Sequence, residues 1–155
     1  MLAKSIREYL DGQHVPYSTI CHGASYTAQE IAATAHISGK NLAKTVMIKL
    51  DGKMVMAVVP AAYHVNFHLM KELTGATKIE LAREDEFKDL FPDYETGAMP
   101  PFGNLYGLDV YVAESLADED VIAFNAGTHT DLIKMAFTNF ARLVKPMILR
   151  FSTRH

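Results

Sequence analysis

The clearest pattern of hydrophobic and polar positions lies between residues 43 and 60. Two apolar runs, rich in methionine and β-branched residues, flank the dipeptide Asp51-Gly52. An Asp-Gly pair between two such runs favours a type I′ turn, so the pattern predicts a β-hairpin of residues 43–50 and 53–60. The uninterrupted apolar content of Val55–Val59 predicts that the second strand is buried on both faces.

The other elements are predicted from periodicity and turn-forming residues. Apolar residues at helical spacing predict four helices and a capping box at Thr27–Glu30 predicts a fifth; their ranges are 2–12, 27–36, 64–74, 83–91 and 138–145. Besides the hairpin, strands are predicted at 17–22, 78–82, 109–113, 121–125 and 132–135. About seven strands thus mix with about five helices, without a regular strand–helix–strand repeat. The predicted fold class is α+β, with a mixed, partly barrel-like β-sheet in a single domain, residues 1–155.

Composition indicates a globular protein. The chain has 155 residues, of which 49% are hydrophobic and 21% are charged. This apolar content excludes a disordered or fibrous chain, and no apolar run approaches the roughly 20 residues that span a bilayer. The single cysteine, Cys21, excludes an internal disulfide framework, and the first 13 residues lack the apolar core of a signal peptide. We therefore expect a cytoplasmic protein without a membrane partner.

The net charge of −3 is unevenly distributed. Residues 79–133 carry 2 basic and 13 acidic groups, whereas residues 134–155 carry 5 basic groups and no acid. A protein that covers a long nucleic-acid duplex needs a dominant positive field, which this chain lacks, so DNA is not an expected partner. The charge distribution still permits contact with one end of a polyanion.

Lys44 is the first residue with candidate chemistry. It lies at the start of the first hairpin strand, and strand alternation places it on the same face as Val46 and Ile48 and on the opposite face from Lys49. Its aliphatic stem can lie along the sheet edge while its ammonium reaches water, an arrangement without a function. The alternative is a lysine at the mouth of a pocket, where it would meet an anionic group.

Two loops contain further candidates. Residues 97–103 include two glycines and two prolines, so this loop is stiff at Pro100-Pro101 and permits close backbone approach at Gly97. Residues 125–131 follow a predicted strand and contain His129, whose imidazole can act as an acid or a base near neutral pH. If they have no function, the loop of residues 97–103 is a rigid connector and His129 is a hydrogen-bonded histidine of a turn.

The histidines and the cysteine do not match a known metal or nucleophile motif. His64 and His68 have the i, i+4 spacing of a metal-binding helix, but no glutamate base and no evident third ligand accompany them. Cys21 and His22 are adjacent on a predicted strand and would point to opposite faces. No Gly-x-Ser-x-Gly sequence is present. We expect neither a metal site nor the nucleophile of a conventional hydrolase.

Taken together, these motifs resemble the YbaK/ProX family of free-standing aminoacyl-tRNA deacylases and the related editing insertion of bacterial prolyl-tRNA synthetase. The resemblance runs from about Ser5 to Lys145 and follows the segments YTAQEIA, GKNLAKTVMIKLDGKMVMAVVPA, GATKIELA, GAMPPFG and VIAFNAGTHTDLIKM. Its specific parts are the strand-borne lysine in AKTVMIK and the Gly-x-x-x-Pro loop from Gly97 to Pro101. The family fold is a mixed, barrel-like β-sheet surrounded by helices, which agrees with the fold predicted above.

The resemblance implies roles for particular residues. Lys44 matches the family's functional lysine, Gly97 its loop glycine, and His129 the histidine of the synthetase insertion. Lys44 and His129 are therefore the predicted catalytic residues. The predicted substrate-binding residues lie in the two loops: Gly97, Ala98, Met99, Pro100, Pro101 and Gly127. In similar proteins the lysine engages the terminal backbone of the tRNA and loop backbone groups hold the aminoacyl moiety, while the terminal ribose hydroxyl assists the reaction without a metal or cofactor.

The resemblance also implies an activity. Family members hydrolyse the ester that joins a wrong amino acid to tRNA, chiefly tRNA for proline. We therefore expect deacylation in trans of a mischarged tRNA that carries a small amino acid such as alanine, serine or cysteine. The expected partners are the acceptor end of that tRNA and prolyl-tRNA synthetase. The alternative is a non-catalytic module of the same fold that holds an aminoacyl or nucleotide ligand.

Overall fold

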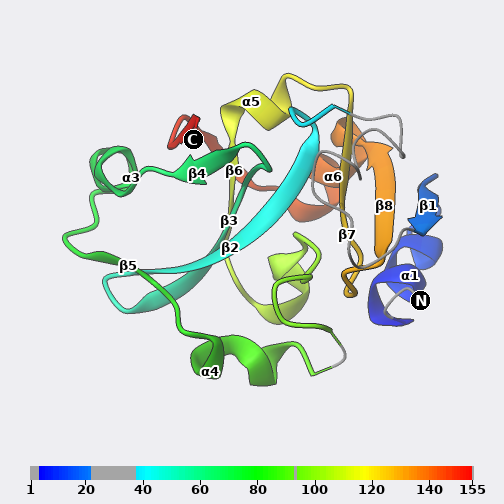
Figure 1. The fold of residues 1–155 in the computed structure, drawn as a ribbon, viewed down its shortest axis with the longest axis horizontal. Helices are drawn as coiled ribbons and strands as arrows, with labels where there is room; N and C mark the ends of the chain where they lie inside the picture. The colour runs from blue at the N-terminus through cyan, green and yellow to red at the C-terminus, as the bar shows by residue number, and fades with distance from the viewer. Residues whose placement is uncertain (1–3, 22–37, 93, 155) are drawn as a thin grey trace.

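A mixed β-sheet forms the centre of the molecule, and helices lie along its faces and ends (Figure 1). The computed structural model describes residues 4–21, 38–92 and 94–154. The strands are β1 (Ser18–Cys21), β2 (Leu42–Leu50), β3 (Lys53–Pro60), β4 (Tyr63–Val65), β5 (Ile79–Leu81), β6 (Val110–Ala113), β7 (Val121–Asn125), β8 (Asp131–Ala136), β9 (Met147–Leu149) and β10 (Ser152–Arg154). The helices are α1 (Lys4–Gly12), α3 (Phe67–Thr74), α4 (Glu84–Phe87), α5 (Glu114–Ala117) and α6 (Phe137–Val144), with short 3₁₀ helices η1 (Lys88–Leu90) and η2 (Gly103–Tyr106). Among the described residues, none of these helices has the length and apolar character that a membrane span requires.

Eight strands form one sheet. Their order is β1-β8-β7-β2-β3-β6-β9, and β5 pairs with the second half of β2. The β2–β3, β7–β8, β1–β8 and β2–β5 pairs are antiparallel, whereas β2–β7, β3–β6 and β6–β9 are parallel. β4 and β10 form a separate two-stranded sheet. This topology confirms the predicted α+β class with a mixed sheet.

The predicted hairpin is confirmed as β2 and β3. Asp51 and Gly52 have φ angles of 50° and 86°, the two positive values that a type I′ turn requires. The Asp51 carboxylate also accepts hydrogen bonds from the backbone N–H groups of Thr77 and Lys78, at 3.1 and 2.8 Å. These bonds tie the turn to the segment that enters β5, so the hairpin and its neighbour strand are held in register.

The predicted helix over residues 64–74 is wrong at its start. Residues Tyr63–Val65 form β4, and α3 begins at Phe67 after Asn66, whose side chain accepts a hydrogen bond from the Leu69 N–H at 3.0 Å. The reason is long-range pairing, because β4 lies antiparallel to β10, a strand near the end of the described chain. The helix ends as predicted at Gly75, which has a φ of 75°.

The sequence pattern also misses several short elements. It does not predict β4, β9, β10 or α5, and the helix predicted at 83–91 divides into α4 and η1. Elements of three or four residues are too short for periodicity to reveal. The described residues therefore contain ten strands rather than about seven. The helix predicted at 27–36 lies outside the described residues.

Hydrophobic side chains pack against both faces of the sheet. On one face, Met47 of β2 lies in a cluster with apolar side chains of α1 and α6. On the other face, Ile48 lies in a cluster with Met70 of α3. Residues Val55–Val59 of β3 contribute alternately to the two clusters and are all buried. The prediction of a strand buried on both faces is thus confirmed.

Candidate functional site

Lys44 lies where β2 passes the carboxyl end of β7. The parallel ladder between these strands ends at the pair Ala43–Phe124, so Lys44 and Asn125 are the next residue of each strand. Lys44 pairs with Val59 across the hairpin and shares a face with the cluster around Ile48, as its alternation predicts. The side chain is half-buried, and this burial lowers the pKa of the Lys44 ammonium. Burial removes part of the hydration of this positive charge, and an anion bound beside Lys44 would stabilise the charge in its place.

Two loops meet beside this strand end. The Gly127 N–H donates a hydrogen bond to the carbonyl oxygen of Ala98 at 2.9 Å, and the Glu95 N–H donates to the carbonyl oxygen of Gly127 at 2.7 Å. The loop of residues 95–98 and the loop of residues 126–130 are therefore joined backbone to backbone. The sequence predicts both loops as candidates but not their contact, because more than 25 residues separate them.

His129 lies beside Gly97 at this junction. The His129 Nε2 lies 2.8 Å from the carbonyl oxygen of Thr96, which can only accept, so Nε2 carries the proton. The His129 backbone N–H donates to Glu95 Oε1 at 2.7 Å. Gly97 has a φ of 86°, and a methyl group at its Cα would lie 3.4 Å from the His129 Cε1 atom. In the neutral form of this ring, Nδ1 is an acceptor beside the exposed Gly97 backbone.

The remaining predicted loop residues lie beneath this surface. The side chains of Ala98, Met99, Pro100 and Pro101 are buried. The Met99 sulfur accepts a hydrogen bond from the Gly97 N–H at 3.3 Å. These residues hold the shape of the loop from below, whereas Gly97 presents its backbone at the surface. Gly127 has a φ of 96° and uses both its N–H and its carbonyl oxygen to join the loops.

Asp131 is a feature that the sequence reasoning missed. Its side chain is 2% exposed, and its carboxylate accepts hydrogen bonds from Thr128 Oγ1 at 2.6 Å and from Cys21 Sγ at 3.1 Å. Burial alone would raise the pKa of Asp131, but hydrogen bonds, those from Thr128 and Cys21 among them, lower this pKa to about 2. The ionised carboxylate thus anchors the loop that carries His129. Donation to the same carboxylate raises the pKa of the Cys21 thiol, which disfavours a cysteine nucleophile.

Several basic side chains and histidines have partners elsewhere. Lys49 lies 3.0 Å from Glu86, and Lys53 lies 2.8 Å from Asp109. His64 belongs to β4 rather than to a helix and lies 3.0 Å from Thr153 Oγ1, while His68 lies 2.9 Å from Glu72. The two histidines therefore do not form the helical i, i+4 pair that their spacing suggests. No group of three or more His, Cys, Asp or Glu side chains is placed to hold a metal ion in the described part of the chain.

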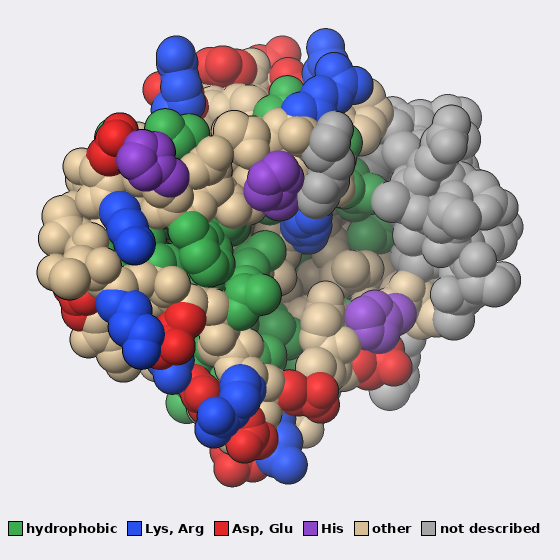
Figure 2. Space-filling view, turned by 60° about the vertical axis from the view of Figure 1, so that its left-hand side comes forward, with side chains coloured by type: hydrophobic (Ala, Val, Ile, Leu, Met, Phe, Trp, Pro, Cys, Tyr) green, Lys and Arg blue, Asp and Glu red, His purple; other side chains and the backbone are tan. Residues whose placement is uncertain are grey.

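The surface is hollowed on the face seen in Figure 2. Hydrophobic side chains gather in and beside this hollow, a basic side chain lies within it, and histidines stand near its rim. A cation set among apolar groups suits a ligand that combines an anionic group with a small apolar part.

Comparison with known proteins identifies relatives. A sequence profile of the aminoacyl-tRNA editing domain matches residues 22–143. The proline–tRNA ligase of Bacillus mycoides (strain KBAB4) is 28% identical over 89 residues, which are 57% of this chain and 16% of the ligase. Proline–tRNA ligase 1 of Bacillus thuringiensis subsp. konkukian (strain 97-27) is 32% identical over 75 residues, 48% of this chain and 13% of the ligase. The chain thus matches less than a fifth of the length of these ligases.

Solved structures share the fold over nearly the whole chain. A protein proposed to be a trans-editing enzyme for prolyl-tRNA synthetase has a TM-score of 0.84 at 17% identity, over 97% of this chain and 96% of that one. Hypothetical protein APE2540 has a TM-score of 0.84 at 20% identity, over 97% and 100% of the two chains. At these identities the likeness shows the fold alone. The profile match covers most of the sequence, and the chain therefore belongs to the aminoacyl-tRNA editing domain family.

Proposed function

We propose that this protein acts in trans to hydrolyse the ester of mischarged tRNA for proline that carries a small amino acid such as alanine, serine or cysteine. Membership of the editing family and similarity to proline–tRNA ligases support the proposal. The structural observation that carries it is the junction of the Gly97 and His129 loops at the end of β7, where β2 holds Lys44. The substrate places a phosphate and a small aminoacyl ester within reach of each other, as a site of this kind requires.

Lys44 binds the terminal phosphate of the tRNA. A half-buried ammonium loses part of its hydration, and a phosphate oxygen restores the lost interaction. The contact fixes the position of the terminal ribose and so of the ester on it. The lysine acts as a point charge for binding and takes no proton from the substrate.

The aminoacyl group lies against Gly97, beside His129. Because Gly97 has no side chain, its backbone can approach the ester closely, and the nearby His129 ring limits the space for the amino acid. The Nδ1 atom of the neutral His129 can accept a hydrogen bond from the substrate ammonium or from the attacking water. Water attacks the ester carbon, the ribose hydroxyl assists, and the products are the free amino acid and uncharged tRNA.

The chemistry of aminoacylation explains the need for such an activity. One methylene gives a synthetase only about 1–3 kcal/mol of discrimination, so small amino acids enter a site built for proline. A second hydrolytic site that admits only small side chains removes these products. The whole chain, residues 1–155, serves in this proposal as one editing domain.

The direct test is hydrolysis of tRNA for proline charged separately with alanine, serine, cysteine and proline. We expect release of at least one small amino acid and retention of proline by the wild-type protein. The Lys44→Ala variant should lose most of this activity, whereas Lys53→Ala on the same hairpin should retain it, because Lys53 is 67% exposed and pairs with Asp109. Binding of all four tRNAs without hydrolysis of any would support the alternative, a non-catalytic aminoacyl-binding module.

A further inference from the structure

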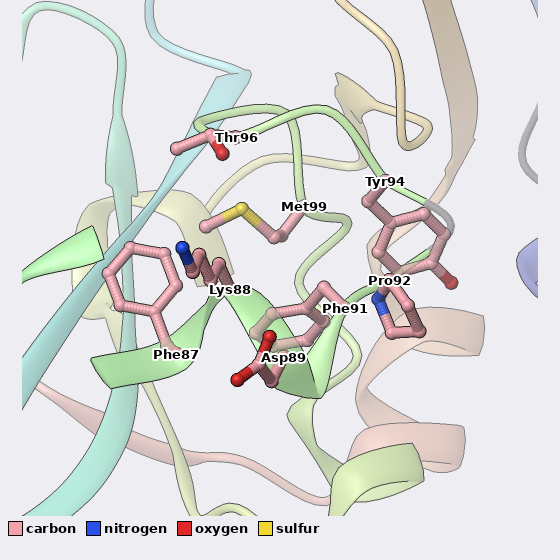
Figure 3. A pocket seen from close by; sticks show the side chains of 8 residues that line it. All are labelled: Phe87, Lys88, Asp89, Phe91, Pro92, Tyr94, Thr96 and Met99. Carbon is pink, nitrogen blue, oxygen red and sulfur yellow. The ribbon is translucent and has the colours of Figure 1, made fainter. Parts of the chain in front are cut away.

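A pocket lies on the other side of the loop that carries Gly97. It has a volume of about 260 Å³ and is bounded by α4, η1 and residues of the 91–99 segment (Figure 3). The apolar side chains that line it include Phe87, Phe91 and Met99, which are 8%, 3% and 4% exposed. Its rim carries the exposed polar side chains of Lys88 and Asp89. A buried apolar floor with a few polar groups at the rim is typical of a small-ligand site.

The pocket presents aromatic rings to its contents. In Figure 3, Phe87 and Tyr94 stand on opposite sides, and Met99 and Phe91 lie between them. Aromatic side chains of this kind bind unpaired nucleobases by stacking, whichever base is present. The volume of about 260 Å³ has room for one base.

The rim adds one cation and one anion to these rings. Arg83 pairs with Asp85 at 3.1 Å, whereas Lys88 makes no ion pair with another described residue. Lys88 can therefore meet a phosphate, and the Asp89 carboxylate can accept a hydrogen bond from an exocyclic amine. A flat base that bears an amine and is joined to a phosphate, as in a cytosine or adenine nucleotide, matches this set.

The pocket shares a wall with the candidate site. Thr96 lines the pocket, and its carbonyl oxygen accepts the His129 Nε2–H bond. Met99 also lines the pocket, and its sulfur accepts the Gly97 N–H. Because neighbouring nucleotides are covalently linked, two successive nucleotides of one strand can occupy the two sides of this loop.

We propose that the pocket binds the cytidine that precedes the terminal adenosine of the tRNA. The base lies over the floor of Met99 and Phe91, flanked by Phe87 and Tyr94, with its amine on Asp89 and the attached phosphate on Lys88. This proposal rests on the proposed function, since the ester on the terminal ribose must reach Gly97 at the same time. Every tRNA ends in the same cytidine-cytidine-adenosine sequence, so the pocket supplies affinity for the acceptor end and leaves the choice of amino acid to the Gly97 side.

The test combines pocket variants with a change in the RNA. We expect Lys88→Ala and Tyr94→Leu to raise the KM for mischarged tRNA about tenfold, with kcat and amino-acid preference unchanged. Tyr94→Phe should raise the KM less than Tyr94→Leu because the ring remains, and Lys78→Ala provides a control lysine that is 72% exposed and outside the pocket. For Lys88→Ala, the slope of log affinity against log salt should be shallower by about 0.7, the loss of one single-strand phosphate contact. Uridine in place of the penultimate cytidine should weaken wild-type binding but not that of Asp89→Ala.

A second readout is independent of hydrolysis. Cytidine 5′-monophosphate should shift the methyl NMR signal of Met99 in the wild-type protein and not in Lys88→Ala. The Lys88→Ala variant should fold normally because the Lys88 side chain is exposed. If no tRNA is deacylated but this shift occurs, the proposed function fails and the pocket assignment stands. If deacylation occurs with unchanged KM in Lys88→Ala and no Met99 shift, the pocket assignment is wrong. A change in relative rates among amino acids would show that the pocket holds the amino acid, and would also overturn it.

Discussion

Lys44 has two opposed properties at the scale of a single residue. Its ammonium is a cation, and its half-buried position lowers the pKa of that ammonium by desolvation. A neighbour of opposite charge would favour the protonated form again. An anionic ligand at this position would therefore stabilise the charged form of Lys44 further. Lys49 lies on the other face of β2 and pairs with Glu80 and Glu86.

The first prediction concerns this charge. Lys44→Ala should lower kcat/KM for deacylation by about 10- to 100-fold, because a hydrogen bond to a charged group contributes roughly 1.5–3 kcal/mol. In the wild type, kcat/KM should fall on the alkaline side at a lower pH than an ordinary lysine would cause, since the lowered pKa releases the proton earlier. Lys44→Arg should lack this decline, because guanidinium stays charged. Rates are measured after subtraction of spontaneous ester hydrolysis, and an identical alkaline decline in Lys44→Arg would remove Lys44 as its cause.

The second prediction concerns the space at Gly97. Gly97→Ala should slow hydrolysis most for the bulkiest accepted amino acid, because the new methyl would lie 3.4 Å from His129 and occupy the approach to the ester. The positive φ of 86° also costs stability, roughly 1–2 kcal/mol for a residue with a side chain. Gly107→Ala is the matched control, since its φ is 72° and nothing lies within 4 Å of its added methyl. Equal losses of activity in both variants would show that strain alone explains the effect.

At the scale of elements, the site depends on how two loops are joined. Glu95 makes two of the bonds between the loops, since its N–H donates to the Gly127 carbonyl oxygen and its carboxylate accepts from the His129 N–H.

The third prediction is that Glu95→Ala and His129→Ala both shift the relative rates for alanine, serine and cysteine more than they lower the highest rate. Glu95→Gln should stay near wild type because its side-chain oxygen still accepts. The measurement is a panel of mischarged tRNAs, and unchanged relative rates in His129→Ala would place His129 outside the site.

The turn between β7 and β8 supplies the fourth prediction. Asp131 has a pKa lowered from 3.8 to about 2, so its ionised form stabilises the fold above pH 4, and this stabilisation is lost as pH falls toward 2. At 1.36 kcal/mol per unit, the shift corresponds to roughly 2 kcal/mol at neutral pH. Denaturant unfolding should show Asp131→Asn to be less stable by about this amount at pH 7, with the difference shrinking between pH 4 and pH 2. A difference that is constant over this range would contradict the role of the ionised carboxylate.

At the scale of the whole molecule, charge limits how much tRNA the protein can hold. Residues 79–133 carry 2 basic and 13 acidic groups, and Lys49, Lys53 and Arg150 are paired with carboxylates. With a net charge of −3 the chain has no dominant positive field, so contacts should concentrate at the acceptor end. This limit agrees with a protein that reads the end of its substrate rather than its body.

The fifth prediction follows from this limit. Affinity for tRNA should fall with salt with a shallow slope, about −1.4 to −2.8 in log K against log salt for two to four single-strand phosphate contacts. A minihelix that contains only the acceptor stem should be deacylated nearly as well as whole tRNA. Inert minihelices together with a much steeper slope would indicate that the tRNA body is read instead.

Elements that need no distant partner can be predicted from local pattern alone. The β2–β3 hairpin needs only an Asp-Gly turn between two apolar runs, and the end of α3 needs only the positive φ of Gly75. The face of Lys44 also follows from strand alternation, which is a local property. β4 and β10 could not be found in this way, since each is a strand only because the other pairs with it across the length of the chain.

In the candidate site, too, the residues can be recognised from local motifs, whereas their contacts depend on the fold. Lys44, Gly97 and His129 are recognisable from motifs, because each lies in a short segment of characteristic composition. The proximity of Gly97 to His129, the two bonds of Glu95, and the burial of Asp131 between Thr128 and Cys21 follow only from the assembled fold. The physical reason is that hydrogen bonds between loops depend on where the strands β2, β7 and β8 place the loop ends. A sequence specifies which groups can bond, and only the assembled sheet determines which of them come within 3 Å.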